Sequence, residues 1–285
     1  MTEPSPGIMP RDQAIMLVAF EGWNDAGSAA SEALGHLAEA WDAQHVESMD
    51  PEGYYDFQVN RPFVESDADG NRRLVYPSTS LATAHPYTTR PPVVLVQGHE
   101  PSFRWPSFCR DLLDQAAEHD IRTLVTVGAL LADVPHTRPI PVTTTSESTN
   151  VRVWLDLEPS TYEGPVGIVA VLAAEARRRR MMTVSLWAAV PHYVAQPPSP
   201  KATLALLEGL ERLLGDPVPR GTLVEDAAEW QRGVDELAQQ DTEIGDYVRR
   251  LEQAKDTADR PEASGDAIAQ EFERYLRRRD QGTGG

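Results

Sequence analysis

Cysteine, lysine and long hydrophobic runs are scarce in this sequence of 285 residues. Cys109 is the single cysteine, so the chain cannot form an internal disulfide bond. The longest apolar stretch, residues 166–174, is far shorter than the ~20 residues that a membrane-spanning helix requires. Residues 1–10 have neither a basic start nor an apolar segment, so we expect no signal peptide. These absences favour a cytoplasmic protein.

Positive charge is scarce as well. Lys201 and Lys255 are the only lysines, and 26 lysines and arginines face 44 aspartates and glutamates, which gives a net charge of −18. Phosphate groups repel such a surface, so nucleic acid and anionic membranes are poor partners. The four arginines at 177–180 end a helical pattern, where cations offset the helix dipole, and they do not change this conclusion.

Several motifs of cofactor and catalytic sites are missing. The sequence has no Gly-x-x-x-x-Gly-Lys and no Gly-x-Gly-x-x-Gly segment, which argues against phosphate-binding and dinucleotide-binding loops. It also lacks Gly-x-Ser-x-Gly, Cys-x-x-Cys and any histidine pair at i and i+4. We therefore expect no cofactor and no metal site.

Strand-like and helix-like patterns alternate through most of the chain. Short apolar runs predict buried strands, and apolar residues at helical spacing predict helices between them. The predicted strands are 15–20, 93–96, 123–127 and 183–190, and the predicted helices are 26–41, 106–119, 165–180 and 200–214, the last with Ser199 as its N-cap. This alternation predicts an α/β fold of three layers, α/β/α, with a mostly parallel sheet.

The segment from about 50 to 92 breaks this alternation. Residues 55–59 alternate polar and apolar, 67–71 form a turn signal, and 73–76 read as a second strand. We predict a β-hairpin inserted at the sheet edge. Asp67 and Asp69 superficially resemble a calcium loop, but the glycine comes too early and the closing glutamate is missing.

The composition changes again after Pro219. A 4-3 spacing continues over 223–258 and forms a heptad seam with polar residues at Asp241 and Lys255. Gly233 and Gly245 are unfavourable in a helix interior and allow a bend near either. A second helical pattern covers 266–279. We predict a core domain, 1–219, and a C-terminal helical hairpin, 220–285, with a disordered tail at 281–285. Because a sustained apolar seam needs a partner surface, we also expect a homo-oligomer.

Polar side chains follow three of the predicted strands where each strand ends. In an open α/β sheet, ligands bind outside the carboxyl ends of the strands. His99, together with Glu100, follows a fourth strand and would reach the same edge. The candidate crevice is therefore Asn24, Asp25, His99, Asp133, His136, Arg138 and His192.

Each candidate also has a purely structural interpretation. Asp25 could cap the helix that opens at Ala26. Arg138 could pair with Asp133 to hold a proline-bounded loop, with His136 bonded to backbone. The sequence leaves these alternatives open.

Four separated motifs carry a family resemblance: residues 22–27 (Gly-Trp-Asn-Asp-Ala-Gly), 127–130 (Val-Gly-Ala-Leu), 133–139 (Asp-Val-Pro-His-Thr-Arg-Pro) and 187–193 (Trp-Ala-Ala-Val-Pro-His-Tyr). The sequence resembles the proteasome assembly chaperone family over roughly residues 15–279, and residues 271–277 are similar to its actinobacterial members. The resemblance implies a fold like that of nucleoside phosphorylases and hydrolases, and a homo-oligomer, possibly a trimer. Chaperone members bind the proteasome α-ring through a C-terminal hydrophobic-Tyr-x ending, whereas this chain ends Gln-Gly-Thr-Gly-Gly.

Three functions compete on this basis. The first is a non-catalytic assembly or binding protein with a protein partner. The second is a small-molecule enzyme that uses the strand-end crevice. The third is a structural homo-oligomer with a vestigial site.

Overall fold

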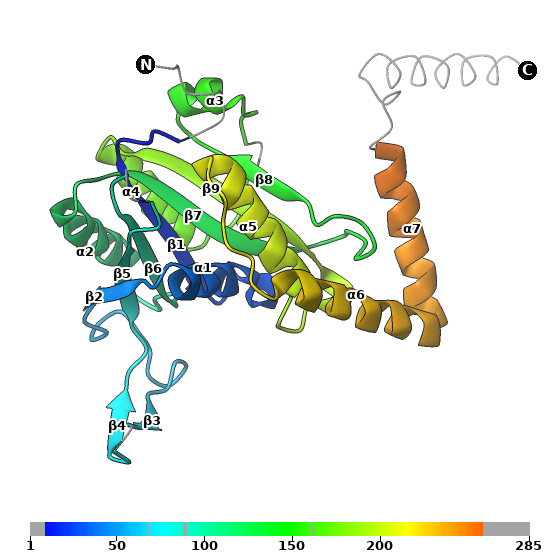
Figure 1. Ribbon diagram of the computed structural model, residues 1–285, viewed down its shortest axis with the longest axis horizontal. Coiled ribbons are helices and arrows are strands. Elements are labelled where there is room, and N and C mark those ends of the chain that lie inside the picture. The colour runs from blue at the N-terminus through cyan, green and yellow to red at the C-terminus, as the bar shows by residue number, and fades with distance from the viewer. Residues whose placement is uncertain (1–8, 68, 88–89, 161, 259–285) are drawn as a thin grey trace, which may run out of the picture.

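The computed structural model describes residues 9–67, 69–87, 90–160 and 162–258. Its centre is a seven-stranded sheet in the order β2-β5-β6-β1-β7-β9-β8 (Figure 1). The four middle strands run parallel, whereas β5 and β8 pair antiparallel with their neighbours β6 and β9, and β2 pairs antiparallel with β5. The strands are β1 Ala14–Glu21, β2 Gln44–Ser48, β5 Thr79–Ala84, β6 Val93–His99, β7 Ile121–Ala132, β8 Val142–Thr145 and β9 Met182–Pro191.

Helices cover both faces of this sheet. Helices α1 (Ala29–Ala40) and α5 (Pro200–Leu214) bury their apolar residues on one face, and α2 (Trp105–Glu118) and α4 (Ile168–Arg178) do so on the other. A short helix, α3 (Thr149–Leu155), follows β8. The predicted three-layer α/β/α fold with a mostly parallel sheet is confirmed, because continuous apolar strands such as β1 are buried on both sides.

The inserted hairpin exists, and its turn and second strand lie where they were predicted, but its first strand was predicted at the wrong residues. It pairs β3 (Phe63–Ser66) with β4 (Arg72–Val75), and the turn between them is held by Asp67 Oδ1, which accepts the Asn71 N–H at 2.8 Å. Residues 55–59, predicted as its first strand, form turns instead. Tyr54 and Tyr55 are consecutive and both buried, which a two-faced strand at the surface does not allow.

Three strands and one helix, β2, β5, β8 and α3, were not predicted. Strand β5 reads Thr-Ser-Leu-Ala-Thr-Ala and β8 reads Val-Thr-Thr-Thr, so neither has a strong apolar pattern. Both extend the parallel centre of the sheet with antiparallel strands toward its edges. The segment 50–92 is therefore only partly an insertion, since β5 belongs to the main sheet.

The chain leaves the core after α5 and forms two helices, α6 (Leu223–Gln240) and α7 (Thr242–Ala258), which we call the arm. The chain does bend within the predicted seam, but at Asp241, between the two glycines: α6 ends there and α7 turns a corner (Figure 1). Asp241 Oδ1 accepts the N–H groups of Glu243 and Ile244 at 2.9 and 3.2 Å and so begins the second helix. The predicted helix at 266–279 and the tail at 281–285 lie outside the described residues. None of the helices described is long and apolar enough to cross a membrane.

Candidate functional site

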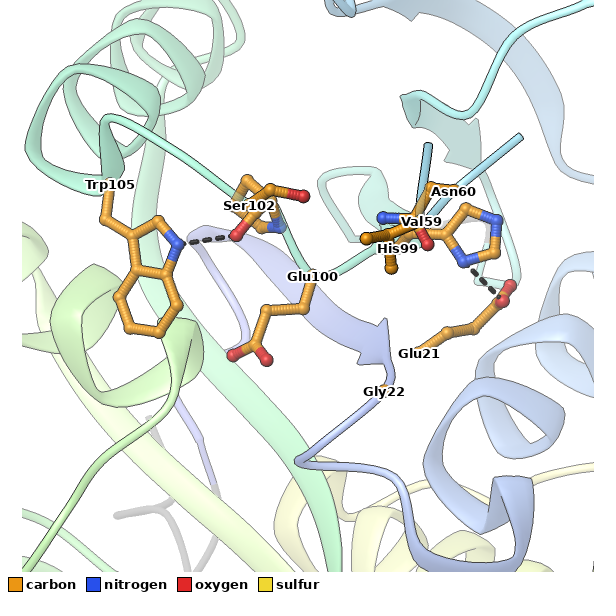
Figure 2. Close-up of a pocket in the computed structure, with 9 residues that line it drawn as sticks. Glu21, Gly22, Val59, Asn60, His99, Glu100, Ser102 and Trp105 are labelled. Atoms are coloured by element: carbon orange, nitrogen blue, oxygen red, sulfur yellow. Dashed lines mark hydrogen bonds and ion pairs between the residues drawn. The ribbon is translucent and has the colours of Figure 1, made fainter. Parts of the chain in front are cut away.

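A groove opens where strands β1 and β6 end. The two strands are adjacent and parallel, and the helices that follow them, α1 and α2, pack on opposite faces of the sheet. This arrangement is the switch point at which α/β sheets bind ligands. The groove has a volume of about 430 Å³ (Figure 2). It is lined by Glu21, Gly22, Val59, Asn60, His99, Glu100, Pro101, Ser102 and Trp105.

Glu21 and His99 pair at the rim of this groove. The His99 Nδ1 atom lies 2.8 Å from Glu21 Oε2, and the two side chains are 40% and 51% exposed. The hydrogen bond that His99 makes to the Glu21 carboxylate raises the pKa of His99, and the same bond lowers the pKa of Glu21. A charged imidazolium–carboxylate pair is therefore favoured here.

Glu100 connects three elements beneath the groove. Its Oε1 atom accepts the side-chain amide of Asn24 at 2.8 Å and the backbone N–H of Ile168 at 2.8 Å, at the start of α4. Asn24 is 1% exposed, and a Cβ atom on Gly167 would lie 2.2 Å from its Oδ1. Asn24 thus lies in a tight internal contact rather than in the open groove.

Asp25 caps the following helix. Its Oδ1 accepts the N–H groups of Ala30 at 2.7 Å and Ser31 at 3.2 Å, and its Oδ2 accepts the Ser31 hydroxyl at 2.5 Å. Burial raises the pKa of this carboxyl. Of the two interpretations offered by the sequence, helix capping is the one that the contacts show.

His136 is buried beneath the arm. Its backbone N–H donates to the Tyr193 hydroxyl, its Nδ1 lies 2.7 Å from the same hydroxyl, and its Nε2 lies 3.0 Å from Asp235 of α6. Because a carboxylate can only accept, Nε2 carries the proton and Nδ1 accepts from Tyr193. Burial lowers the pKa of His136, which favours this neutral form.

Arg138 also binds the arm. Its Nε and Nη2 donate to the two oxygens of Asp256 at 2.8 and 2.7 Å, and its Nη1 donates to Glu252 at 3.1 Å. The predicted pairing with Asp133 is therefore wrong. Sequence spacing favours a partner five residues away, whereas the fold supplies α7, more than a hundred residues further along the chain.

Asp133 and His192 complete the contact with the arm. Asp133 Oδ1 lies 3.2 Å from His192 Nδ1 and accepts the hydroxyl of Tyr247, on α7, at 3.0 Å. The rings of His192, Tyr193 and Tyr247 meet edge to face, with centroids 5.4–5.9 Å apart. On the same side, Lys201 donates to the His136 carbonyl and to Gln231 of α6.

The seven candidates therefore divide into three groups. His99 lines the groove, with Asn24 beneath it, while Asp25 caps α1 and the other four hold the arm. Sequence reasoning missed Glu21, Ser102 and Trp105, although Glu21 directly follows a strand. It also missed the three arm carboxylates, Asp235, Glu252 and Asp256. The heptad pattern is defined by apolar residues, so it does not indicate which acidic residues make contacts.

Cys109 is a buried free thiol, and burial raises its pKa to about 12, so it is an internal packing residue. Among the residues that the structure describes, no three His, Cys, Asp or Glu side chains gather in a way that could hold a metal ion.

The chain is similar to several proteins of known structure. A PAC2 family protein from Streptomyces avermitilis is 48% identical, with a TM-score of 0.77 over 82% of this chain and 99% of that one. A proteasome-assembly chaperone homologue from Mycobacterium tuberculosis is 42% identical, with a TM-score of 0.74 and the same coverage. PbaB of Pyrococcus furiosus, an archaeal proteasome activator, is 16% identical with a TM-score of 0.60 over 82% of this chain and 97% of that one, and shows the fold alone.

No functionally curated protein matches the sequence significantly. The model of the PAC2 family, in contrast, matches residues 19–238, which include the end of β1, every other strand of the main sheet, the strand-end candidates and most of α6. The chain belongs to the PAC2 family.

Proposed function

We propose that this protein is a non-catalytic assembly protein that binds other proteins, in the manner of proteasome assembly chaperones. The carrying observation is that four strand-end residues, Asp133, His136, Arg138 and His192, position a helical arm rather than a ligand. Because these reactive side chains hold a projecting pair of helices, they favour a protein that offers a binding surface over one that catalyses a reaction.

The relatives support this proposal. The Mycobacterium tuberculosis protein of 42% identity is described as a proteasome-assembly chaperone homologue. With it we propose a homo-oligomer such as a trimer, a cytoplasmic location, and a division into a core, 1–219, and an appendage, 220–285. The net charge of −18 supports a protein partner rather than nucleic acid.

Assembly in vitro tests the proposal. Purified chain is mixed with separately purified, unassembled proteasome α and β subunits of the same organism, and particle formation is followed on native gels. We expect binding to free subunits and faster assembly, with the chain absent from the mature particle. An unrelated acidic protein of similar size is the control. Unchanged assembly together with no binding to either subunit would refute the proposal.

The groove of Figure 2 favours a second candidate, a small-molecule site. The Glu21–His99 pair, Glu100 and Ser102 line this groove together with Trp105, whose indole Nε1 donates to the Pro101 carbonyl at 2.5 Å. A thermal-shift screen of polar metabolites against wild type and His99→Ala tests it. A stabilising compound whose effect disappears in the variant would support a small-molecule function, and a screen without such a compound would argue against it.

A further inference from the structure

The β3–β4 hairpin projects from the body as a separate two-stranded sheet (Figure 1). Val64 and Leu74 form a cross-strand pair on one of its faces and are 47% and 61% exposed. Arg72 lies two residues from Leu74 and therefore on the same face. It is exposed and has no ion pair or hydrogen bond within the described residues. An isolated two-stranded hairpin is only marginally stable in water. We therefore expect another protein surface to pack on this apolar, cationic face.

Helix α6 has an apolar notch at the other end of the molecule. Trp230, Gly233 and Leu237 follow one another at helical spacing beside the buried residues of α6, and Leu237 is 41% exposed. Among the described residues, a Cβ atom on Gly233 would meet nothing within 4 Å. Glycine is unfavourable in a helix interior, and no neighbour in the described part of the chain requires it. A surface glycine between two large apolar residues leaves room for a group from outside the chain.

The rim of this notch is acidic. Glu229 lies one helical turn before Gly233, and Glu236 lies one turn after it. Both are exposed and have no partner within the described part of the chain. The segment 223–258 has ten acidic and four basic residues, a net charge of −6, whereas the hairpin segment 61–76 has three of each and is neutral. The hairpin face is thus apolar with an unpaired cation, and the notch is apolar with unpaired anions.

We propose that the hairpin of one copy docks in the α6 notch of a second copy, with Val64 and Leu74 over Gly233 and Arg72 beside Glu229 and Glu236. The two surfaces complement each other but project from different parts of the same chain, so they meet only between copies (Figure 1). Such a head-to-tail contact joins unlike surfaces and can close into a ring. The proposal deepens the self-association proposed above and rests on it.

A complementation experiment tests this contact. Leu74→Asp places a charge on the hairpin, and Leu237→Asp places one in the notch. We expect wild type to be oligomeric by size exclusion with light scattering, and each variant alone to have the 31.4 kDa mass of the monomer. A mixture of the two variants retains one intact hairpin and one intact notch, so it should form a dimer of twice that mass and nothing larger.

Two further variants exclude misfolding as the cause. Gly233→Leu fills the notch with a better helix former, so it should fold stably and still be monomeric. Val224→Asp changes an equally exposed residue, 49% accessible, on the other side of α6, and should remain oligomeric. A Leu237→Asp or Gly233→Leu protein that stays oligomeric, or a mixture that stays monomeric, overturns the contact while leaving self-association intact. A monomeric wild type overturns both, and subunit binding by the proteasome assay is independent of either result.

Discussion

Three imidazole–carboxylate pairs lie at the strand-end edge of this molecule, and the pairs of His99 and His136 differ in burial. His99 pairs with Glu21 at the rim of an open groove, with 40% of the imidazole exposed. His136 pairs with Asp235 beneath the arm, with 1% exposed. The pKa of His99 is raised by its hydrogen bond to Glu21, whereas burial lowers the pKa of His136 despite the same kind of partner. Burial rather than partner chemistry therefore decides which histidine carries a charge.

The comparison also separates two roles. The side chains of His99 and Glu21 are both accessible to a molecule in the groove. The hydrogen bond between His136 and Asp235 instead holds α6 against the core. We therefore expect substitutions at the arm contact to change stability and the position of the arm. Substitutions of Glu21 or His99 at the rim of the groove should change binding with little effect on stability.

The largest effect is expected for His136→Ala. It removes two buried hydrogen bonds and leaves a cavity between Tyr193 and Asp235. We expect the free energy of unfolding to fall by about 2–4 kcal/mol in urea denaturation. Limited proteolysis should also cut faster at residues 217–222, where the arm leaves the core. His192→Ala, in which 44% of the imidazole is already exposed, is the control and should cost less than about 1 kcal/mol. Equal effects of the two variants would contradict the distinction between a buried and a rim histidine.

A smaller effect is expected for Glu100→Ala. The variant leaves the Asn24 amide and the Ile168 N–H without their acceptor, so unfolding should become about 1–3 kcal/mol easier. Glu100→Gln is the matched control, because its amide oxygen can still accept both bonds, and it should retain most of the stability. Thermal denaturation of the two variants distinguishes a structural carboxyl from one that acts only through its charge. A glutamine variant as unstable as the alanine variant would mean that the negative charge itself is required.

How well each strand or helix could be predicted depended on how strong its pattern of apolar residues is in the sequence. Strands β1, β6, β7 and β9 were predicted from continuous apolar runs, and helix α5 was predicted at its observed bounds. The first strand of the exposed hairpin was misplaced because Tyr54 and Tyr55 pack inward from turns, which a local alternation rule cannot recognise. The break between α6 and α7 was not placed at Asp241, because this residue stands at a regular seam position yet caps a new helix.

The site was predictable in position but not in pairing. Residues at the carboxyl ends of parallel strands do meet at one edge, as the location of His99, His136 and His192 shows. Their partners Asp235, Glu252 and Asp256 come from helices about a hundred residues later, and only the packing of the arm brings them together. Glu252 and Asp256 differ in no local respect from the other acidic residues of the arm.

Arg138→Ala should act locally and depend on salt. Its guanidinium is 34% exposed and bridges Glu252 and Asp256, so its loss should loosen α7 without unfolding the core. We expect faster hydrogen exchange of α7 amides at low salt, and a smaller difference from wild type at 1 M salt, where ion pairs are screened. Arg232→Ala removes the same charge from an exposed position on α6 and is the control. Uniformly faster exchange throughout the sheet would show that Arg138 stabilises the core instead.

The smallest effect concerns the Glu21–His99 pair, and its sign depends on pH. The pKa of His99 is raised above its ordinary 6.5, so its stabilisation is complete below pH 6.5 and is lost as pH rises through the folded-state value. The pKa of Glu21 is lowered below its ordinary 4.5, so its stabilisation is complete above pH 4.5 and is lost as pH falls through the folded-state value. The pair therefore contributes most between pH 4.5 and 6.5, and by less than about 1 kcal/mol because both side chains are half exposed.

Urea denaturation at pH 5.5 and pH 8.5 measures this window. His99→Ala should lower the free energy of unfolding at the acidic pH and have almost no effect at the alkaline one. The buried histidine predicts the opposite direction, because the lowered pKa of His136 means that its neutral form stabilises the fold above pH 6.5 and that this stabilisation is lost as pH falls. His136→Ala should therefore cost more at pH 8.5 than at pH 5.5. If the two variants showed the same pH dependence, burial would not be what sets the charge of these two histidines.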